Sequence, residues 1–364
     1  MEVAGRSRRR FIPRKTPGYH MVLIDDIGSF PLPEGVTRES FNRAYPAAQE
    51  AFAARRRLEE VPELEPFLTA VESSLLAKLD TQLDIVTYPQ HYDMHTQFMH
   101  PIEKHQREPY LIDERYAVIP EVYVAERVAK LRYEETGERV RLRVCVTGPV
   151  ELYLKTPFGF SVYEEVLLNL AESVRAFLRN SILDRKHIRT EVVSIDEPSL
   201  GFVDLLNVER EGIIKALERC IRGVDAEVQV HLHTLKAAEY PLEAEGVSTI
   251  TAEFASAPEN IELITREELE AADRYLRGGV ASTSIDRKLG ELAQRGIRNP
   301  TPEQLADPEE SIARLYLKLR ERFGDRLRFA GPDCGLGSWP SQEAARLVLE
   351  RCVRAVRGAE SSSA

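Results

Sequence analysis

Short apolar runs recur along the chain, and most of them alternate with longer segments of helical periodicity. A run such as 140–146, with apolar residues at every second position, is typical of a strand. We predict strands at 21–27, 83–87, 140–146, 190–195, 226–233, 247–252, 275–281 and 327–330. Apolar residues spaced by three or four predict helices at 38–57, 65–83, 122–135, 163–183, 208–222, 302–323 and 341–356.

Strands that alternate with helices are typical of a parallel sheet covered by helices. Eight such units predict an α/β fold, a single (β/α)8 TIM barrel over residues 21–357. No linker rich in Gly, Pro or Ser divides the 364 residues into two domains. A doubly wound sheet is the alternative, but no G-x-G-x-x-G motif follows the first predicted strand.

The two ends of the chain differ from the predicted barrel. Residues 1–20 are rich in arginine and lack the apolar stretch of a signal peptide. We expect a basic, solvated and flexible N-terminal arm, which could pack on a partner subunit, and a transit peptide is the alternative. Residues 358–364 end in S-S-S-A and predict a mobile tail.

The composition argues against several classes of partner. A net charge of -10 argues against nucleic-acid binding, and no apolar run approaches the ~20 residues that a membrane span needs. The four cysteines are Cys145, Cys220, Cys334 and Cys352, widely spaced and without C-x-x-C. In a chain of this size they predict reduced thiols in a cytoplasmic protein, not a disulfide framework.

Reactive or turn-forming residues follow the predicted strands, one set for each strand. They are Ser29, Gln90, Thr147, Asp196 with Glu197, His231 with His233, Glu253, Ser284 and Cys334. The carboxyl ends of barrel strands converge on one face, where the active sites of this fold lie. We therefore expect these residues to share one pocket.

Four of these residues form a candidate metal site. His231 and His233 would project from the same face of a strand, a spacing that suits metal ligation. Glu253 adds an oxygen and Cys334 a thiolate, and this mixed ligand set favours Zn²⁺ over magnesium or calcium. Each has a simpler explanation on its own: polar residues at a strand end, a solvated carboxylate, or a buried small thiol.

Two further strand ends suggest substrate contacts. Asp196 could hold a substrate ammonium, or could instead favour the start of a helix through the helix dipole. Ser29, after Gly28, could offer its hydroxyl or N–H to a substrate carboxylate, or could simply form a turn. The histidines at 91, 95, 100 and 105 are expected near a helix that lines the pocket, not in a second metal site.

Six motifs, in this order, resemble the catalytic C-terminal domain of cobalamin-independent methionine synthase and its shorter archaeal relatives. They are I-G-S-F-P at 27–31, L-D-I-V-T at 83–87, D-M at 93–94, T-G-P-V at 147–150, I-D-E-P at 195–198 and P-D-C-G-L at 332–336. The resemblance covers residues 21–357. It implies a (β/α)8 barrel, a catalytic zinc, and methyl transfer to the sulfur of homocysteine, which gives methionine.

The resemblance also implies roles for individual residues. The zinc ligands would be His231, Glu253 and Cys334, and His233 occupies the position where the family usually has a cysteine ligand. Imidazole in place of thiolate makes a zinc centre one unit more positive. The amino-acid contacts implied by the resemblance are Ile27, Gly28, Ser29 and Asp196, with Gln90 where the family has a glutamate.

Two departures from the family bear on the methyl donor. Full-length relatives carry, after the seventh strand, a histidine thought to act as an acid toward the folate leaving group, and the corresponding place here is at or near Ser284. We also expect the folate-oriented N-terminal domain of those relatives to be missing. Both departures predict a methylcorrinoid, or a corrinoid protein, as donor in place of methyltetrahydrofolate.

The prediction is therefore an enzyme, a zinc-dependent S-methyltransferase that acts on a small thiol, homocysteine or another thiol such as coenzyme M. One alternative is a zinc-binding relative that no longer transfers methyl groups and serves as a binding or interaction subunit. Another is a zinc lyase or hydrolase on the same scaffold, with a water on the metal where the thiol would be.

Overall fold

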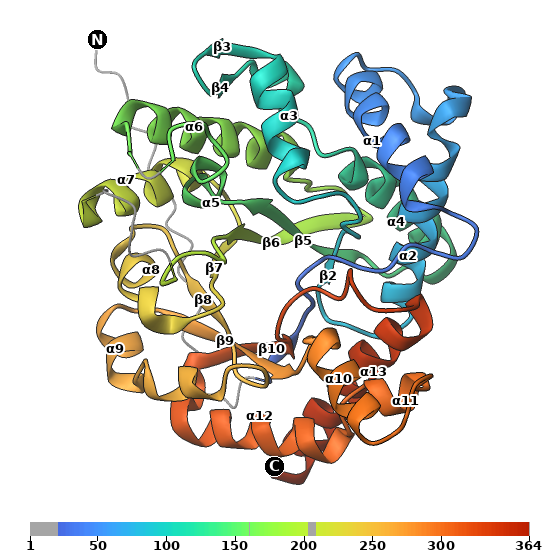
Figure 1. The fold of residues 1–364 in the computed structure, drawn as a ribbon, viewed down its shortest axis with the longest axis vertical. Helices are drawn as coiled ribbons and strands as arrows, with labels where there is room; N and C mark the ends of the chain where they lie inside the picture. Colours follow the sequence, from blue (N-terminus) through green and yellow to red (C-terminus); the bar gives the residue numbers. More distant parts are fainter. Residues whose placement is uncertain (1–20, 160, 203–208, 364) are drawn as a thin grey trace.

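A computed structural model describes residues 21–159, 161–202 and 209–363 (Figure 1). Within these residues, eight parallel strands form one sheet in the order β1-β10-β9-β8-β7-β6-β5-β2. The strands are β1 Leu23–Ile24, β2 Val86–Thr87, β5 Val140–Thr147, β6 Ile188–Asp196, β7 Glu227–His231, β8 Thr249–Glu253, β9 Tyr275–Ala281 and β10 Leu327–Pro332. Each of the eight predicted strands is confirmed.

The sheet closes on itself between β1 and β2. Isolated parallel bridges pair Asp25 with Ile85 and Ser29 with Gln90. The Ile85 N–H donates to the Ile24 carbonyl at 3.2 Å, and the Phe30 N–H donates to the Gln90 carbonyl at 3.2 Å. These contacts join the first and last strands of the sheet order, so the predicted (β/α)8 barrel is confirmed.

Helices surround the sheet on its outer side (Figure 1). They are α1 Arg38–Ala53, α2 Glu65–Leu79, α3 Thr96–Lys104, α4 Pro120–Thr136, α5 Pro149–Tyr153, α6 Glu164–Ser181, α7 Arg210–Ile221, α8 Glu239–Glu243, α9 Arg266–Ala271, α10 Ile285–Gln294, α11 Pro302–Leu305, α12 Glu309–Phe323 and α13 Gln342–Ser363. A small antiparallel hairpin, β3 Gln106–Glu108 and β4 Leu111–Ile112, follows α3. No helix in the described ranges combines the length and the apolar character needed to cross a membrane.

One segment that was predicted as a single helix forms two helices in the structure. The segment 302–323 is divided into α11 and α12, and Pro308 is the residue that precedes α12. Proline has no N–H to continue a helix, and it disfavours helical geometry in the residue before it. The division follows from this proline.

The predicted end of the closing helix at Val356 is also wrong. α13 continues to Ser363, through most of the segment that was expected to form a tail. The Val22 N–H donates to the Glu360 carboxylate at 2.8 Å, and Arg357 forms an ion pair with the same side chain at 3.1 Å. These contacts join the helix to the start of the barrel. Residues 1–20, the predicted arm, and residue 364 lie outside the described residues.

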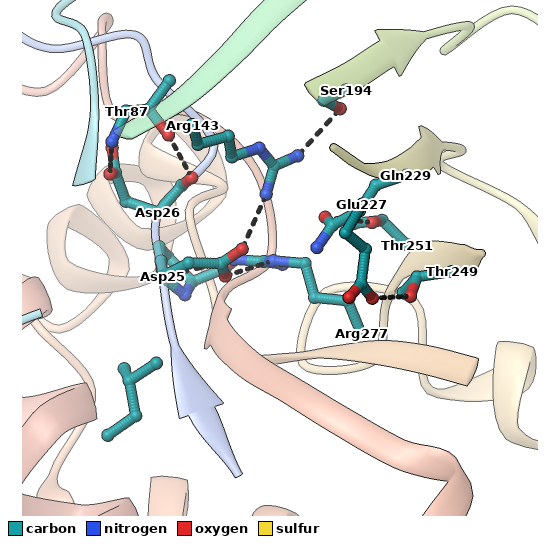
Figure 2. Close-up of polar contacts among 12 residues, drawn as sticks. Asp25, Asp26, Thr87, Arg143, Ser194, Glu227, Gln229, Thr249, Thr251 and Arg277 are labelled. Atoms are coloured by element: carbon teal, nitrogen blue, oxygen red, sulfur yellow. Dashed lines mark hydrogen bonds and ion pairs between the residues drawn. The ribbon is translucent and has the colours of Figure 1, made fainter. Parts of the chain in front are cut away.

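A charged cluster fills part of the barrel interior (Figure 2). The Asp25 carboxylate accepts from Arg143 Nη1 at 2.9 Å and from Arg277 Nε at 2.6 Å, and all three side chains are fully buried. Arg143 Nη2 also donates to Ser194 Oγ at 2.8 Å. Because two guanidinium groups share one carboxylate, this cluster carries an excess positive charge inside the barrel.

A second buried ion pair lies between α2 and the start of the barrel. Lys78 Nζ is 2.6 Å from the Asp26 carboxylate, and it donates to the Gly28 carbonyl at 2.6 Å. Asp26 in turn accepts from the Thr87 N–H at 2.8 Å. This pair ties α2 to the point where β1 and β2 meet.

The Asp25 cluster generates a stability prediction. Asp25→Asn preserves the shape of the side chain but leaves two buried guanidinium groups without their shared anion. We expect the free energy of unfolding to fall by about 3–5 kcal/mol, because removal of one partner leaves the other buried charges unpaired. Urea denaturation of the variant and the wild type measures the change.

The exposed pair Glu39–Arg43 on α1 provides the matched control, since both of its side chains are more than three-quarters exposed. Glu39→Gln should cost less than about 1 kcal/mol, the usual value for a surface pair. A loss for Asp25→Asn no larger than that of the control would contradict the role assigned to the interior cluster.

Candidate metal centre

Four side chains from three strand ends meet at one rim of the barrel. His231 ends β7, His233 lies two residues beyond it, Glu253 ends β8, and Cys334 follows β10. One nitrogen, oxygen or sulfur atom from each of the four lies within 4.8 Å of every other. The structure thus brings together the four residues that the sequence predicts as metal ligands.

The spacing of these atoms fits a tetrahedral site. Cys334 Sγ lies 3.6 Å from Nε2 of His231 and 3.6 Å from Nε2 of His233, and His233 Nε2 lies 3.6 Å from a Glu253 oxygen. Ligands placed ~2.0–2.3 Å from a tetrahedral zinc are roughly 3.3–3.8 Å from one another. The nitrogen–oxygen separation is too long for an ordinary hydrogen bond.

Burial acts on the protonation of all four side chains. It holds the pKa of His231 well below its usual value and also lowers the pKa of His233, so both imidazoles are available as neutral ligands. Burial, with the nearby Glu253 carboxylate, raises the pKa of the Cys334 thiol to about 12. Burial, with Asp333, raises the pKa of Glu253 to about 7. A divalent cation among these groups would stabilise both anions, so the ligand chemistry fits a metal.

Two buried residues hold the ligand-bearing loops in place. Asn260 Nδ2 donates to the carbonyls of His233 at 2.9 Å and Glu253 at 2.7 Å. Asp333, beside Cys334, accepts three N–H groups from residues 254–256, directly after Glu253. Neither residue was predicted from the sequence. Asp333 lies inside the P-D-C-G-L motif, which marks its position, whereas no motif in the sequence marks Asn260.

The predicted substrate residues of the first loop lie against the Cys334 loop. Ser29 Oγ accepts from the Gly337 N–H at 3.1 Å, and the Ser29 carbonyl accepts from the Leu336 N–H at 2.9 Å. Gly28 has φ +137°, and a Cβ there would lie 2.7 Å from the side-chain oxygen of Gln90. Glycine is therefore needed for this close approach.

An open pocket of about 320 Å³ adjoins this loop, lined by Ser29, Phe30, Arg38, Asn42, Gln90, His91, Tyr92, Asp93 and Gly337. It brings together two predicted substrate residues, Ser29 and Gln90. Ile27 is buried beneath the loop, with 5% of its surface exposed, so its side chain offers little to a ligand.

Asp196 lies beside the candidate metal ligands. It ends β6 and pairs in register with His231 on β7, so the two side chains point to the same face of the sheet. Ser194 Oγ donates to Asp196 Oδ1 at 2.7 Å, and burial raises the pKa of Asp196 to about 6. The neighbouring Glu197 accepts the N–H groups of Val150 and Glu151, which start α5, and therefore has a structural role.

The other strand-end residues contact protein groups. Thr147 Oγ1 donates to the Met94 carbonyl at 2.7 Å. Ser284 Oγ donates to Ser256 Oγ at 3.0 Å, and Ser256 Oγ is 2.9 Å from Ser282 Oγ, so hydroxyl groups gather beyond the end of β9.

The histidine run is only partly on the expected helix. His100 is exposed on α3, while His95 and His105 flank that helix. His95 Nε2 lies 2.7 Å from a Glu151 oxygen, and His105 Nε2 lies 2.8 Å from a Glu50 oxygen. These rings connect structural elements to one another.

Two curated proteins are similar in sequence to the chain. They are the 5-methyltetrahydropteroyltriglutamate–homocysteine methyltransferases of Streptomyces coelicolor and Streptomyces avermitilis, each 25% identical, over 238 and 225 residues. The matches cover 64% and 60% of this chain but only 28% and 27% of the two relatives. The chain thus matches little more than a quarter of their length. No family model matches the chain.

Solved structures show the same fold. A B12-independent methionine synthase from Shewanella sp. W3-18-1, in complex with selenomethionine, superposes with a TM-score of 0.53 at 14% identity and covers 94% of this chain and 99% of that one. A methyltransferase from Methanosarcina mazei gives a TM-score of 0.52 at 14% identity, with 94% and 95% coverage. With the two sequence relatives, these findings confirm the resemblance predicted from the motifs.

The ligand set generates a prediction about metal content. We expect the purified protein to carry about one zinc, and Cys334→Ser to lose most of it, because a neutral hydroxyl replaces a thiolate ligand. Elemental analysis of both proteins measures the difference. Cys220→Ser is the matched control, since that buried thiol donates to the Leu217 carbonyl away from the site and a hydroxyl can do the same. Full zinc occupancy in Cys334→Ser would show that Cys334 is not a ligand.

A second prediction concerns His233, the residue that departs from the family pattern. His233→Ala should weaken zinc binding by more than the ~10–100-fold that loss of an outer partner costs, whereas His233→Cys should retain the metal. Competition with a chromophoric chelator gives the affinities, and His100→Ala, an exposed histidine on α3, is the control. An unchanged affinity in His233→Ala would leave a site of three protein ligands.

Proposed function

We propose that this relative of the cobalamin-independent methionine synthases is a zinc-dependent S-methyltransferase that methylates a small thiol. The observation that carries the proposal is the meeting of His231, His233, Glu253 and Cys334 at one rim, with all ligand atoms within 4.8 Å of one another and three of the separations 3.6 Å. Asp196 and the Gly28–Ser29 loop border the same rim, so a metal ligand set and groups suited to an amino acid lie together.

The charges of the ligand set suit zinc. Two neutral imidazoles, one carboxylate and one thiolate balance a divalent cation. Zinc bound there would lower the pKa of a substrate thiol and hold it as the thiolate. With His233 where the family has a cysteine, the ligands carry one negative charge fewer, which favours thiolate formation but makes the thiolate a weaker nucleophile.

The groups around the metal ligands favour homocysteine as the acceptor. The carboxylate of Asp196 can accept a hydrogen bond from a substrate ammonium, and the loop at Ser29 can approach a substrate carboxylate through its backbone. Coenzyme M has no ammonium, and its sulfonate would meet a carboxylate at Asp196. Against homocysteine, Gln90, which is bridged to Ser29, is neutral where the family has a glutamate, so one negative charge that could attract a substrate ammonium is missing.

The local chemistry beyond β9 favours a methylcorrinoid over a folate. When the thiolate attacks methylcobalamin, a sulfur–carbon bond forms and the carbon–cobalt bond breaks, leaving its electron pair on cobalt. When it attacks methyltetrahydrofolate, a carbon–nitrogen bond breaks, and the nitrogen needs a proton in order to leave. Ser284 stands at or near the position where the resemblance puts the family's acid, and its hydroxyl donates to Ser256 Oγ, which is 2.9 Å from Ser282 Oγ. Hydroxyls of serine do not supply a proton readily near neutral pH.

The four free cysteines agree with a reducing compartment, and we place the enzyme in the cytoplasm as part of this proposal.

The donor assignment is tested by comparing the two methyl sources with zinc-loaded protein. We expect methylated thiol from homocysteine with methylcobalamin, and at most a trace with methyltetrahydrofolate, because general-acid assistance is typically worth ~10²–10⁴ in rate. Mass spectrometry of the methylated product, with homocysteine and coenzyme M as acceptors, gives the rates. Comparable rates from the folate would overturn the donor assignment.

If neither donor gives methylated product with either thiol, in protein that retains its zinc, the result would instead favour a non-catalytic binding protein. Cys334→Ser serves as the inactive control, since it removes a candidate metal ligand.

A further inference from the structure

We infer that Ser194 and Arg143 are positioning residues for Asp196, and that through Asp196 they make the site selective for a thiol that carries an ammonium group. This inference rests on the proposed function, because it concerns the substrate of the same site.

A buried chain of hydrogen bonds runs from the barrel interior to the site. Arg143 Nη2 donates to Ser194 Oγ at 2.8 Å, and Ser194 Oγ donates to Asp196 Oδ1 at 2.7 Å. Arg143 is itself fixed by the carboxylate of Asp25 at 2.9 Å (Figure 2). Arg143 and Ser194 are fully buried, whereas Asp196 retains 6% of its surface. Asp196 is therefore the end of the chain that a ligand can reach.

The strand geometry directs this chain toward the candidate ligands. Ser194 and Asp196 are two residues apart on β6, so their side chains share one face. On the neighbouring strand β7, Ser194 pairs in register with Gln229, and Asp196 pairs with His231. Asp196 and His231 therefore lie at the same level of the barrel. Because Ser194 holds one oxygen of Asp196, the carboxylate cannot rotate freely, and its other oxygen remains for a ligand in the layer of His231.

The charge of the interior supports the same role. Arg143 and Arg277 share the single carboxylate of Asp25, which leaves a net positive charge beneath Asp196. Burial raises the pKa of Asp196, while these two arginines act to lower it. They thus offset part of the cost of keeping an anion in a buried position.

A carboxylate that is oriented and charged in this way distinguishes ligands that carry an ammonium group from ligands that do not. It stabilises a ligand ammonium through a charge-assisted hydrogen bond, and it contributes nothing to a ligand that lacks one. A purely structural role for Ser194, such as holding β5 to β6, would affect all ligands of the site equally.

The test compares two thiols that differ only in the ammonium group. Homocysteine and 4-mercaptobutanoate have the same thiol, chain length and carboxylate. The affinity of each is measured by calorimetry on zinc-loaded wild type and Ser194→Ala, with zinc content determined for both proteins. We expect Ser194→Ala to weaken homocysteine binding roughly tenfold, as loss of a hydrogen bond to a charged group implies, and to leave 4-mercaptobutanoate binding nearly unchanged.

Two further variants complete the test. Asp196→Asn keeps the shape but removes the charge, and it should show the same selective loss. Ser173→Ala is the matched control, because this fully buried serine of α6 bonds to the Tyr110 carbonyl away from the barrel axis, and it should change neither affinity.

The outcomes separate this inference from the proposed function. Equal weakening of both thiols in Ser194→Ala, or no change in either, would overturn the positioning role while homocysteine binding by the wild type stands. If the wild type binds neither thiol, the proposed substrate and the selectivity inferred from Asp196 are both overturned.

Discussion

Closure of the sheet between β1 and β2 is the constraint on which the candidate site depends. β1 and β2 are only two residues each, and they are joined by the bridges Asp25–Ile85 and Ser29–Gln90. A closed parallel barrel must bring the carboxyl ends of all its strands to one rim. His231 and Cys334, about a hundred residues apart, thereby come within 3.6 Å. The cluster of Asp25, Arg143 and Arg277 spans the interior just inside this closure.

Charge is distributed in layers along the barrel axis. The interior layer carries two guanidinium groups for one carboxylate, and the layer above it holds Asp196 and the neutral imidazole of His231. Positive charge below the rim disfavours protonation of His231, whose pKa is lowered mainly by burial, and it favours the anionic form of Asp196. The same charge cluster inside the barrel therefore acts on both a candidate metal ligand, His231, and the proposed substrate contact, Asp196.

The strands and the strand-end residues were predictable because they depend on local patterns, apolar alternation followed by turn residues. The interior cluster was not. In β5 the alternation assigns Leu142 and Val144 to the buried face, but a closed barrel buries both faces, so Arg143 also lies inside. Its partner Asp25 is 118 residues away, a pairing that only the fold reveals. The extension of α13 to Ser363 likewise depends on a distant contact, between Glu360 and Val22.

The central claim is that one sulfur, one oxygen and two nitrogen atoms of this chain hold a zinc ion that receives the substrate thiol. X-ray absorption spectroscopy at the zinc edge tests it most directly. The account predicts one sulfur neighbour at ~2.3 Å with nitrogen or oxygen neighbours at ~2.0–2.2 Å, and a second sulfur when homocysteine is added. A zinc coordination shell without sulfur in the substrate-free protein, or a coordination shell that homocysteine leaves unchanged, would contradict it.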